Sequence, residues 1–201
     1  NMRTGGDRNP DYPGAFAFDN DFPALMPDIP APQSDDAVFR MEAARGTARV
    51  ICYSPDHSRT MPQMSLPAIR SLIDCWADES AALAQRFANV AVFENKGAMM
   101  GCSSPHPHGQ IWASDFVPTE VADEDREQAA WRAARGSVLL DEVAARELAA
   151  GDRVVEANDH WLAVVPWWAV WPFEILLIAR DDVSRIEALP DPARDALARI
   201  L

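Results

Sequence analysis

The stretch Gly101-Cys-Ser-Ser-Pro-His-Pro-His-Gly-Gln110 places two histidines and an amide at alternate positions. Alternate side chains of an extended segment project to the same face. We therefore expect His106, His108 and Gln110 to converge on one small volume, at the start of a strand that runs to Phe116. A neutral imidazole is a competent nucleophile towards phosphorus near pH 7, and an amide donates to a phosphate oxygen without adding charge.

An isolated His-x-His pattern has three readings: a metal-ligand pair, a nucleophile with its neighbour, and chance. The preceding loop of Gly, Ser and Cys favours a functional reading, because its backbone N–H groups are available to an anion. What transfer of a nucleotidyl group requires is an in-line nucleophile with donors on the nonbridging oxygens. The residues alone do not choose between a metal role and a nucleophilic role for each histidine.

Working outward, the flanking segments alternate between strands and helices. We predict strands at 15–18, 48–53 and 90–93, with a helix from Ser65 to about Ala88. Residues 119–150 are predicted to be helical with a break near Gly136, followed by strands at 154–156, 161–165 and 173–179. A last helix is predicted to start with Asp191 as its N-cap. This mixture indicates an α+β fold.

A shift in composition at Gly151 predicts two domains, 1–150 and 151–201. The last helix shows no C-cap, and the chain does not begin with Met, so we expect both ends to be truncated and the second domain to be incomplete. Neither a dinucleotide-binding glycine motif nor a P-loop is present in the sequence.

Charge and composition exclude several classes of protein. The formal net charge of −13 argues against a nucleic-acid binder, and it means that a phosphate ester must be held by local donors. No apolar run has membrane-spanning length. The three cysteines form no Cys-x-x-Cys pair, so we predict a protein of the reducing cytoplasm.

Three stretches carry a resemblance to a known family: 92–113 (VFENKGAMMGCSSPHPHGQIWA), 49–58 (RVICYSPDHS) and 160–174 (HWLAVVPWWAVWPFE). Together they resemble the galactose-1-phosphate uridylyltransferases of the histidine-triad superfamily over essentially the whole chain. The motif is specific, because most histidine-triad hydrolases have a third histidine where this chain has Gln110. The resemblance implies a mostly antiparallel sheet with flanking helices, with a first repeat that is nearly complete and a second that is truncated.

The resemblance also implies a two-step transfer in galactose metabolism. UDP-glucose gives its uridylyl group to a histidine, which His108 matches, and galactose 1-phosphate then accepts the group. Gln110 matches the residue that bonds the transferred phosphoryl group. The other substrate contacts implied by the resemblance lie on the uridine side, at Thr4, Asn20, Asp21 and Phe22, and on the phosphate side, at Asn95, Cys102 and Ser103.

Metal sites are implied by the resemblance as well. His57 and His106 match two ligands of a structural zinc site, whose Cys-x-x-Cys pair lies upstream of Asn1 in the family. Glu124 matches a ligand of a second site, for iron or a second zinc, whose histidines belong to the missing C-terminal part. Without the resemblance, Glu124 reads as a solvated residue of an acidic helix.

The remaining conspicuous residues are interpreted structurally. His160 is expected to be structural or at the surface, with nothing convergent around it, and Cys102 to have a packing or contact role rather than that of a catalytic thiol. The tryptophan cluster is expected in the core and interface of the second part rather than on a stacking surface: Trp161, Trp167, Trp168 and Trp171.

The function expected from these observations is uridylyl transfer by a cytoplasmic homodimer with zinc as a cofactor. Its substrates would be UDP-glucose and galactose 1-phosphate, without nucleic acid or membrane partners. The alternatives are a histidine-triad nucleotide hydrolase or phosphorylase, with water or phosphate as the acceptor, and a noncatalytic fragment that binds metal or nucleotide.

Overall fold

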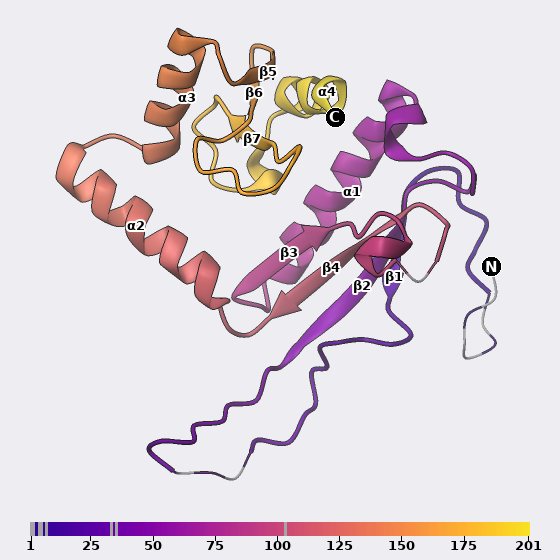
Figure 1. Cartoon of the computed structure of the whole chain (residues 1–201). Helices are drawn as coiled ribbons and strands as arrows, with labels where there is room; N and C mark the ends of the chain where they lie inside the picture. Colours follow the sequence, from indigo (N-terminus) through magenta and orange to yellow (C-terminus); the bar gives the residue numbers. More distant parts are fainter. Residues whose placement is uncertain (1–2, 4–5, 7, 33, 35, 103) are drawn as a thin grey trace. The chain divides into compact units, whose positions relative to one another are not determined.

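The structure is a computed structural model that describes residues 3, 6, 8–32, 34, 36–102 and 104–201. The chain forms two compact units, 1–117 and 118–201 (Figure 1). The boundary expected from composition, between residues 150 and 151, falls inside the second unit, where a helix ends. Helices and antiparallel sheets occur in both units, which confirms the α+β fold class.

The first unit is a four-stranded antiparallel sheet with the strand order β1-β2-β4-β3. Its strands are β1 (Phe16–Asp19), β2 (Gly46–Cys52), β3 (Asn89–Phe93) and β4 (His108–Ser114). The helix α1 (Leu66–Ala84) precedes β3, and two 3-10 turns, η1 (Met61–Gln63) and η2 (Ala98–Met100), lie in the loops. The strands fall where the sequence predicts them, within one or two residues at most ends.

One face of this sheet is covered by α1. Ile51 on β2 and Ile111 on β4 are fully buried, as are Leu72 and Ile73 on the helix. Arg49 lies two residues from Ile51 on β2 and therefore faces the same side of the sheet. Its guanidinium donates to the carboxylate of Glu79 on α1. The odd-numbered residues of β2 and β4 therefore face the helix. The even-numbered residues face away from it, and this leaves one side of the sheet available for a site.

The second unit contains α2 (Thr119–Arg135), α3 (Leu139–Ala150) and a three-stranded antiparallel sheet ordered β5-β6-β7. The strands are β5 (Val154–Ala157), β6 (Trp161–Val164) and β7 (Leu176–Ala179), and α4 (Asp191–Ile200) follows the 3-10 turn η3 (Ile186–Ala188). Leu162 and Val164 pack with Ala144 of α3, while α4 contacts β6. Both faces of β6 are therefore covered.

Two expectations about the second unit are wrong, namely the core position of three of its four tryptophans and the N-cap of its last helix. Trp161 is buried, but Trp167, Trp168 and Trp171 are 77%, 54% and 75% exposed, so they are not core residues. They follow the end of β6 in a loop, where strand alternation no longer turns side chains inward. The last helix has Pro190, not Asp191, at its N-cap position.

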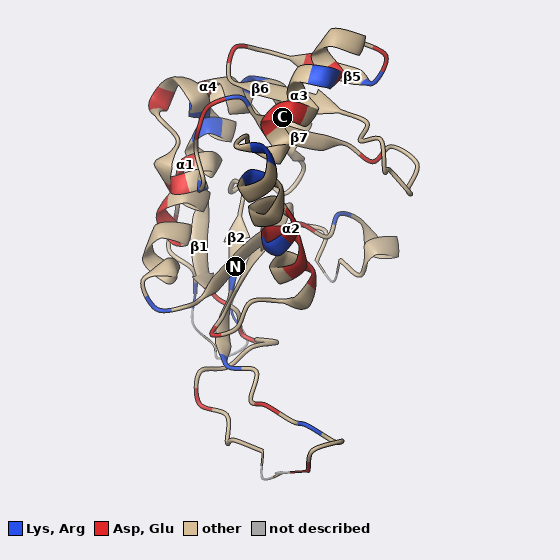
Figure 2. Cartoon of the chain, turned by 90° about the vertical axis from the view of Figure 1, so that its left-hand side faces the viewer, with Lys and Arg blue, Asp and Glu red and all other residues tan. Residues whose placement is uncertain are grey.

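Charged residues of both signs are spread over the cartoon in the view of Figure 2, and the blue basic residues do not gather on one face there. Within the part of the chain that the structure describes, no helix has the length and apolarity needed to cross a membrane.

Candidate active site

His108 begins β4, and its ring is fixed by the backbone. Its Nδ1 lies 2.7 Å from the carbonyl oxygen of His106. A carbonyl oxygen only accepts hydrogen bonds, so Nδ1 carries the proton and donates it. In a neutral imidazole the other nitrogen, Nε2, then holds the lone pair. The local fold thus selects the tautomer in which Nε2 is the nucleophilic atom.

Strand register brings further side chains to the same face as His108. Cys52 lies opposite His108, and Val50 lies opposite Gln110, in the antiparallel pairing of β2 with β4. All four line a cavity of about 260 Å³, here called the front cavity, together with Phe18 of β1. His108 and Gln110 therefore share a face, as the alternation in the sequence predicts.

Gly109 is required between these two residues. A Cβ at this position would lie 2.9 Å from the Tyr53 hydroxyl oxygen and 3.2 Å from the Phe93 carbonyl oxygen. The Tyr53 hydroxyl donates to Glu94 at 3.1 Å, and burial, followed by the Glu94 carboxylate, raises the pKa of this tyrosine well above its usual value. Glycine thus lets the β4 backbone lie directly against a buried tyrosine that stays protonated.

The far wall of the front cavity is built around Arg3. Its guanidinium donates to Asp21 at 2.5 Å and to the carbonyl of Asp19 at 2.5 Å, and it lies 4.9 Å from the ring centre of Phe18. Asn20 accepts a hydrogen bond from the N–H of Phe22, which closes a tight turn that presents Asn20 and Asp21 to the cavity. The segment is therefore both a turn and part of the cavity wall, so a structural role and a role in binding are compatible.

Cys52 forms part of the cavity wall as an inert thiol. Burial raises its pKa, and Tyr12 is its hydrogen-bond partner. The pKa of Tyr12 is raised in turn to about 12, first by burial and then by Cys52. A protonated thiol is a poor nucleophile, so Cys52 contributes shape rather than chemistry.

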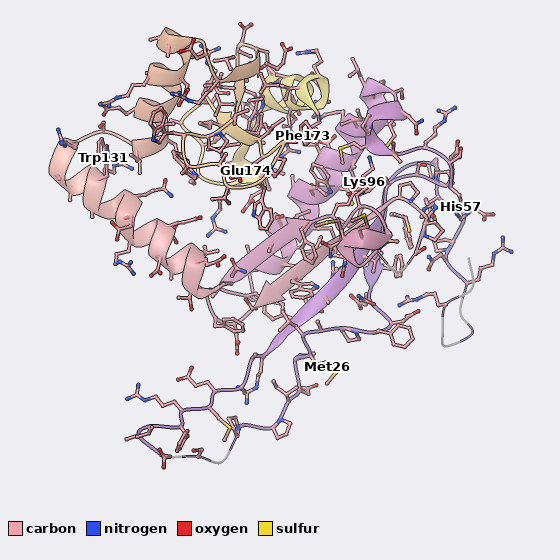
Figure 3. All side chains as sticks on the ribbon, in the orientation of Figure 1. Met26, His57, Lys96, Trp131, Phe173 and Glu174 are labelled. Carbon is pink, nitrogen blue, oxygen red and sulfur yellow. The ribbon has the colours of Figure 1, made fainter. Side chains whose placement is uncertain are left out.

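A second cavity of about 440 Å³, here called the rear cavity, also opens on His108. It lies between the N-terminal end of β4 and the loop around η2, and Asn95, Lys96 and Cys102 line it. The Sγ–H of Cys102 donates to the carbonyl of Ser104 at 2.9 Å, which ties this loop together. Figure 3 labels Lys96 and His57, which lie towards the same end of the first unit's sheet.

His57 and His106 face each other across the entrance to β4. Their Nδ1 atoms are 2.8 Å apart, and the ring planes meet at 65°. Burial, and then the proximity of His57, lowers the pKa of His106, which favours the neutral form that binds metals. Among the described residues no group of three His, Cys, Asp or Glu side chains is placed to hold a metal ion. The pair thus presents two nitrogen donors and not a complete set.

The other predicted site residues are distributed unevenly. Phe22 is 75% exposed and does not line the front cavity, while Glu124 is exposed on α2 in the second unit. Thr4 and Ser103 lie outside the described residues. Among the lining residues of the two cavities that the sequence-based prediction missed are Arg3, Phe18, Val50, Cys52 and Lys96. The alternation of side chains along β2 could have identified Val50 and Cys52 as site residues, but only if the pairing register of β2 with β4 had been known.

The expectation that nothing converges on His160 is wrong. Its Nδ1 lies 2.6 Å from a carboxylate oxygen of Asp181, and both side chains are partly buried. Asp181 follows β7, whose pairing with β6 brings it beside His160. This contact depends on strand pairing over 21 residues of sequence, which no local pattern reveals.

Comparison with known proteins adds to this geometry. Residues 1–118 match the family model of the galactose-1-phosphate uridyl transferase N-terminal domain, and residues 124–201 match that of its C-terminal domain. Galactose-1-phosphate uridylyltransferases of Haemophilus influenzae and Rattus norvegicus are each 48% identical to the chain, over 100% and 98% of its length. The chain spans 58% and 52% of these two relatives, so about half of their length.

A solved structure of a uridylyltransferase mutant superposes with a TM-score of 0.90 at 25% identity. The match covers 98% of this chain and 63% of that one.

Proposed function

The chain belongs to the galactose-1-phosphate uridylyltransferase family, and on that premise we propose that the protein transfers a uridylyl group from UDP-glucose to galactose 1-phosphate. The observation that carries this proposal is the hydrogen bond from His108 Nδ1 to the His106 carbonyl, which leaves Nε2 as the nucleophile. A covalent uridylyl-histidine intermediate divides the transfer into two simpler displacements.

In the first displacement the lone pair of Nε2 attacks the α-phosphorus of UDP-glucose. The bond from this phosphorus to the bridging oxygen breaks, and its electrons leave with glucose 1-phosphate. The uridylyl-imidazolium that results has its Nδ1–H directed at the His106 carbonyl, whose dipole stabilises the positive charge. A phosphate oxygen of galactose 1-phosphate then attacks the same phosphorus, and the N–P bond breaks to regenerate neutral His108.

Gln110 and the front cavity supply the donors and the shape. Gln110 is two residues from His108 on the same face of β4, which supports assigning its amide N–H group the role of donor to a nonbridging oxygen. On the far wall, Asn20 and Asp21 offer hydrogen-bonding groups of the kind that recognise a ribose and a base. Phe22 is assigned to the nucleoside by the family resemblance alone, because its side chain is exposed and does not line the front cavity.

Zinc is proposed as a structural ion held in part by His57 and His106. Imidazole nitrogen is a favoured zinc donor, and the two facing imidazoles offer two of the four donors that a tetrahedral zinc site needs. Such an ion would cross-link the loop after β2 to the start of β4, and would thereby hold the segment that carries His108. A second metal ion at Glu124, iron or zinc, rests on the family resemblance.

A cytoplasmic homodimer completes the proposal. The three cysteines are free, which is the expected state in a reducing compartment: Cys52, Cys75 and Cys102. The dimer rests on the family resemblance.

The test is to incubate the protein with UDP-glucose labelled in the α-phosphate and to map the modified peptide. We expect one acid-labile uridylyl group on the peptide that contains His108, together with ping-pong kinetics when galactose 1-phosphate is added. The matched control is His108→Asn, which should take up no label. A sequential mechanism without a labelled peptide would refute the proposal.

The acceptor distinguishes the remaining activities of this superfamily. Water as the acceptor would release UMP from the labelled enzyme, and inorganic phosphate would yield UDP. We expect galactose 1-phosphate to discharge the label as UDP-galactose much faster than either. Rapid discharge by water or phosphate would instead identify a hydrolase or a phosphorylase.

A further inference from the structure

His108 lies between two residues that contact the same tyrosine. Tyr53 directly follows β2 and is 2% exposed. Its backbone N–H donates to the carbonyl oxygen of Pro107 at 3.2 Å, which extends the pairing of β2 with β4 one step beyond Cys52 and His108. The peptide group that precedes His108 is therefore held in place by Tyr53.

The ring of Tyr53 contacts the backbone on the other side of His108. An ideal Cβ at Gly109 would lie 2.9 Å from the Tyr53 hydroxyl oxygen and 3.2 Å from its Cε1 atom. Nonbonded carbon atoms prefer separations of about 3.5–4.0 Å, so the ring leaves no room for a side chain at Gly109. A change in the backbone conformation of His108 would carry Gly109 into this ring or away from it. Tyr53 thus restrains the chain both before and after His108.

The hydroxyl group anchors the ring on the far side of β4. It donates to a carboxylate oxygen of Glu94 at 3.1 Å, and Glu94 directly follows β3. In the sheet, β2 and β3 are the two neighbours of β4. The side chain of Tyr53 therefore starts at the end of β2, crosses β4 at Gly109 and ends at the residue that follows β3. This hydrogen bond fixes the ring at its tip, as the strand pairing fixes it at its backbone.

Tyr53 approaches His108 from the side of the sheet that faces away from the site. It lies two residues beyond Ile51, on the face that α1 covers, whereas the imidazole of His108 projects from the opposite face. Tyr53 is accordingly not among the described residues that line the two cavities. Its influence on the reaction must therefore pass through the backbone of His108.

This restraint matters because an in-line displacement is sensitive to position. The Nε2 lone pair must point at the α-phosphorus, and a displacement of about 1 Å can cost about 100-fold in rate. The hydrogen bond from Nδ1 to the His106 carbonyl sets the rotation of the His108 imidazole relative to the backbone. It does not fix where that backbone lies, whereas the contacts of Tyr53 do.

From these contacts we propose that Tyr53 is a positioning residue for uridylyl transfer, which holds the backbone around His108 so that Nε2 meets the phosphorus in line. This inference rests on the proposed uridylyl transfer. Tyr53 exchanges no proton and makes no covalent bond in either displacement. Loss of its ring therefore slows the formation and the discharge of uridylyl-His108 and leaves the affinity for nucleotide unchanged. Loss of the hydroxyl alone has a smaller effect, because the ring still lies against Gly109.

The first test compares Tyr53→Leu, which removes the ring, with Tyr53→Phe, which removes only the hydrogen bond to Glu94. For Tyr53→Leu we expect the rate constant of His108 uridylylation at saturating UDP-glucose to fall by about 100-fold. Tyr53→Phe should stay within about fivefold of wild type, the effect of one hydrogen bond. The dissociation constant of UMP, measured by calorimetry, should change by less than about threefold in both variants.

The control for lost stability is Leu72→Ala, which opens a gap at a fully buried position of α1 in the same unit. It should lower the melting temperature at least as much as Tyr53→Leu does. At a temperature well below both melting transitions, its uridylylation rate should stay near wild type. A loss of rate in Leu72→Ala equal to that in Tyr53→Leu would show that Tyr53 acts through general stability alone, and would overturn the inference.

A second pair of variants decides the case in which Tyr53→Leu does not fold. Gly109→Ala places a Cβ against the Tyr53 hydroxyl oxygen, the nearest atom in its way, and should slow uridylylation by about 100-fold. Adding Tyr53→Phe removes that oxygen and should restore about tenfold of the rate, a coupling within the range for residues in contact.

Three results would overturn the inference while wild-type transfer persists. They are a wild-type uridylylation rate in Tyr53→Leu, a loss of UMP affinity in parallel with the loss of rate, and additive effects of Gly109→Ala and Tyr53→Phe. Absence of transfer in the wild type would instead refute the proposed function.

Discussion

Two strands of this protein have a histidine at or directly before their first residue, and they differ in what covers them. His108 is the first residue of β4, and His160 immediately precedes β6. Both rings are fixed through Nδ1, by a backbone carbonyl at 2.7 Å in the first case and by the Asp181 carboxylate at 2.6 Å in the second. On β4, buried residues alternate with partly exposed ones, whereas all four residues of β6 are buried.

This difference in burial distinguishes β4, which carries the candidate site, from β6, which belongs to a core. One face of β4 packs towards α1 and the other opens into two cavities, so side chains such as Gln110 remain available to a ligand. Because α3 and α4 cover the two faces of β6, its side chains serve the packing of the second unit. The partner of each ring also differs in charge: the Nδ1 atom of His108 faces a neutral carbonyl oxygen, whereas that of His160 faces a carboxylate oxygen.

The largest expected effect comes from replacing the two histidines in turn. His108→Asn should lower kcat for uridylyl transfer by at least about 10³-fold, because the nucleophile is lost. His160→Asn should leave kcat within about threefold, as for a substitution outside the site. UMP affinity, measured by calorimetry, should be nearly unchanged in both. A large loss of turnover in the His160 variant, with its fold intact, would make β6 part of the site.

Gln110→Glu sharpens the comparison on β4 itself. The substitution keeps the size of the side chain but replaces an N–H donor with a carboxylate that repels phosphate. We expect kcat to fall by about 10²- to 10³-fold, the effect of removing one donor to a developing charge. The thermal melting temperature should hardly change, because Gln110 lines a cavity and not the core. A matched loss of stability would show that Gln110 is structural.

The sequence predicted the bounds of both β4 and β6 within two residues, but it predicted the side-chain environment better around β4 than around β6. One face of β4 is buried and the other is not, so buried and accessible residues alternate along its sequence. This alternation correctly predicted that His108 and Gln110 share a face. The predicted segments for β1 to β4 also lie close to the observed strands. Trp167, Trp168 and Trp171 follow β6 in a loop, and their hydrophobicity incorrectly suggested that they belong to the core.

Contacts that depend on strand register could not be predicted. Cys52 joins the front cavity only because it pairs with His108, and Asp181 reaches His160 only because β7 pairs with β6. A shift of one residue in either register would send these side chains to the opposite face. Lys96 was not singled out because a lone lysine in a loop carries no periodicity, and only the folded loop places it at a cavity.

Trp161→Phe tests the structural role assigned to β6. The indole Nε1–H donates to the Ala193 carbonyl of α4 at 2.8 Å in a buried position. Its removal should lower the free energy of unfolding by about 1–3 kcal/mol, since a buried hydrogen bond is lost and a small gap is left. Chemical denaturation would measure this. Transfer activity under native conditions should stay within about twofold of wild type, as expected for a change distant from the reacting atoms.

The smallest expected effect is that of Asp181→Asn, which removes the charge that faces His160. Both side chains are partly exposed, so solvent screens the pair, and an exposed ion pair is worth about 0–1 kcal/mol. We expect the free energy of unfolding to fall by no more than this amount, and the difference from wild type to shrink between low salt and about 1 M salt. Uridylyl labelling of His108 should proceed at the wild-type rate. The control is Asp159→Asn, which removes a neighbouring carboxylate outside this ion pair. A stability loss well above about 1 kcal/mol that persists in high salt would mean that the His160–Asp181 pair is a tightly coupled structural element, and loss of labelling would end the distinction drawn between β4 and β6.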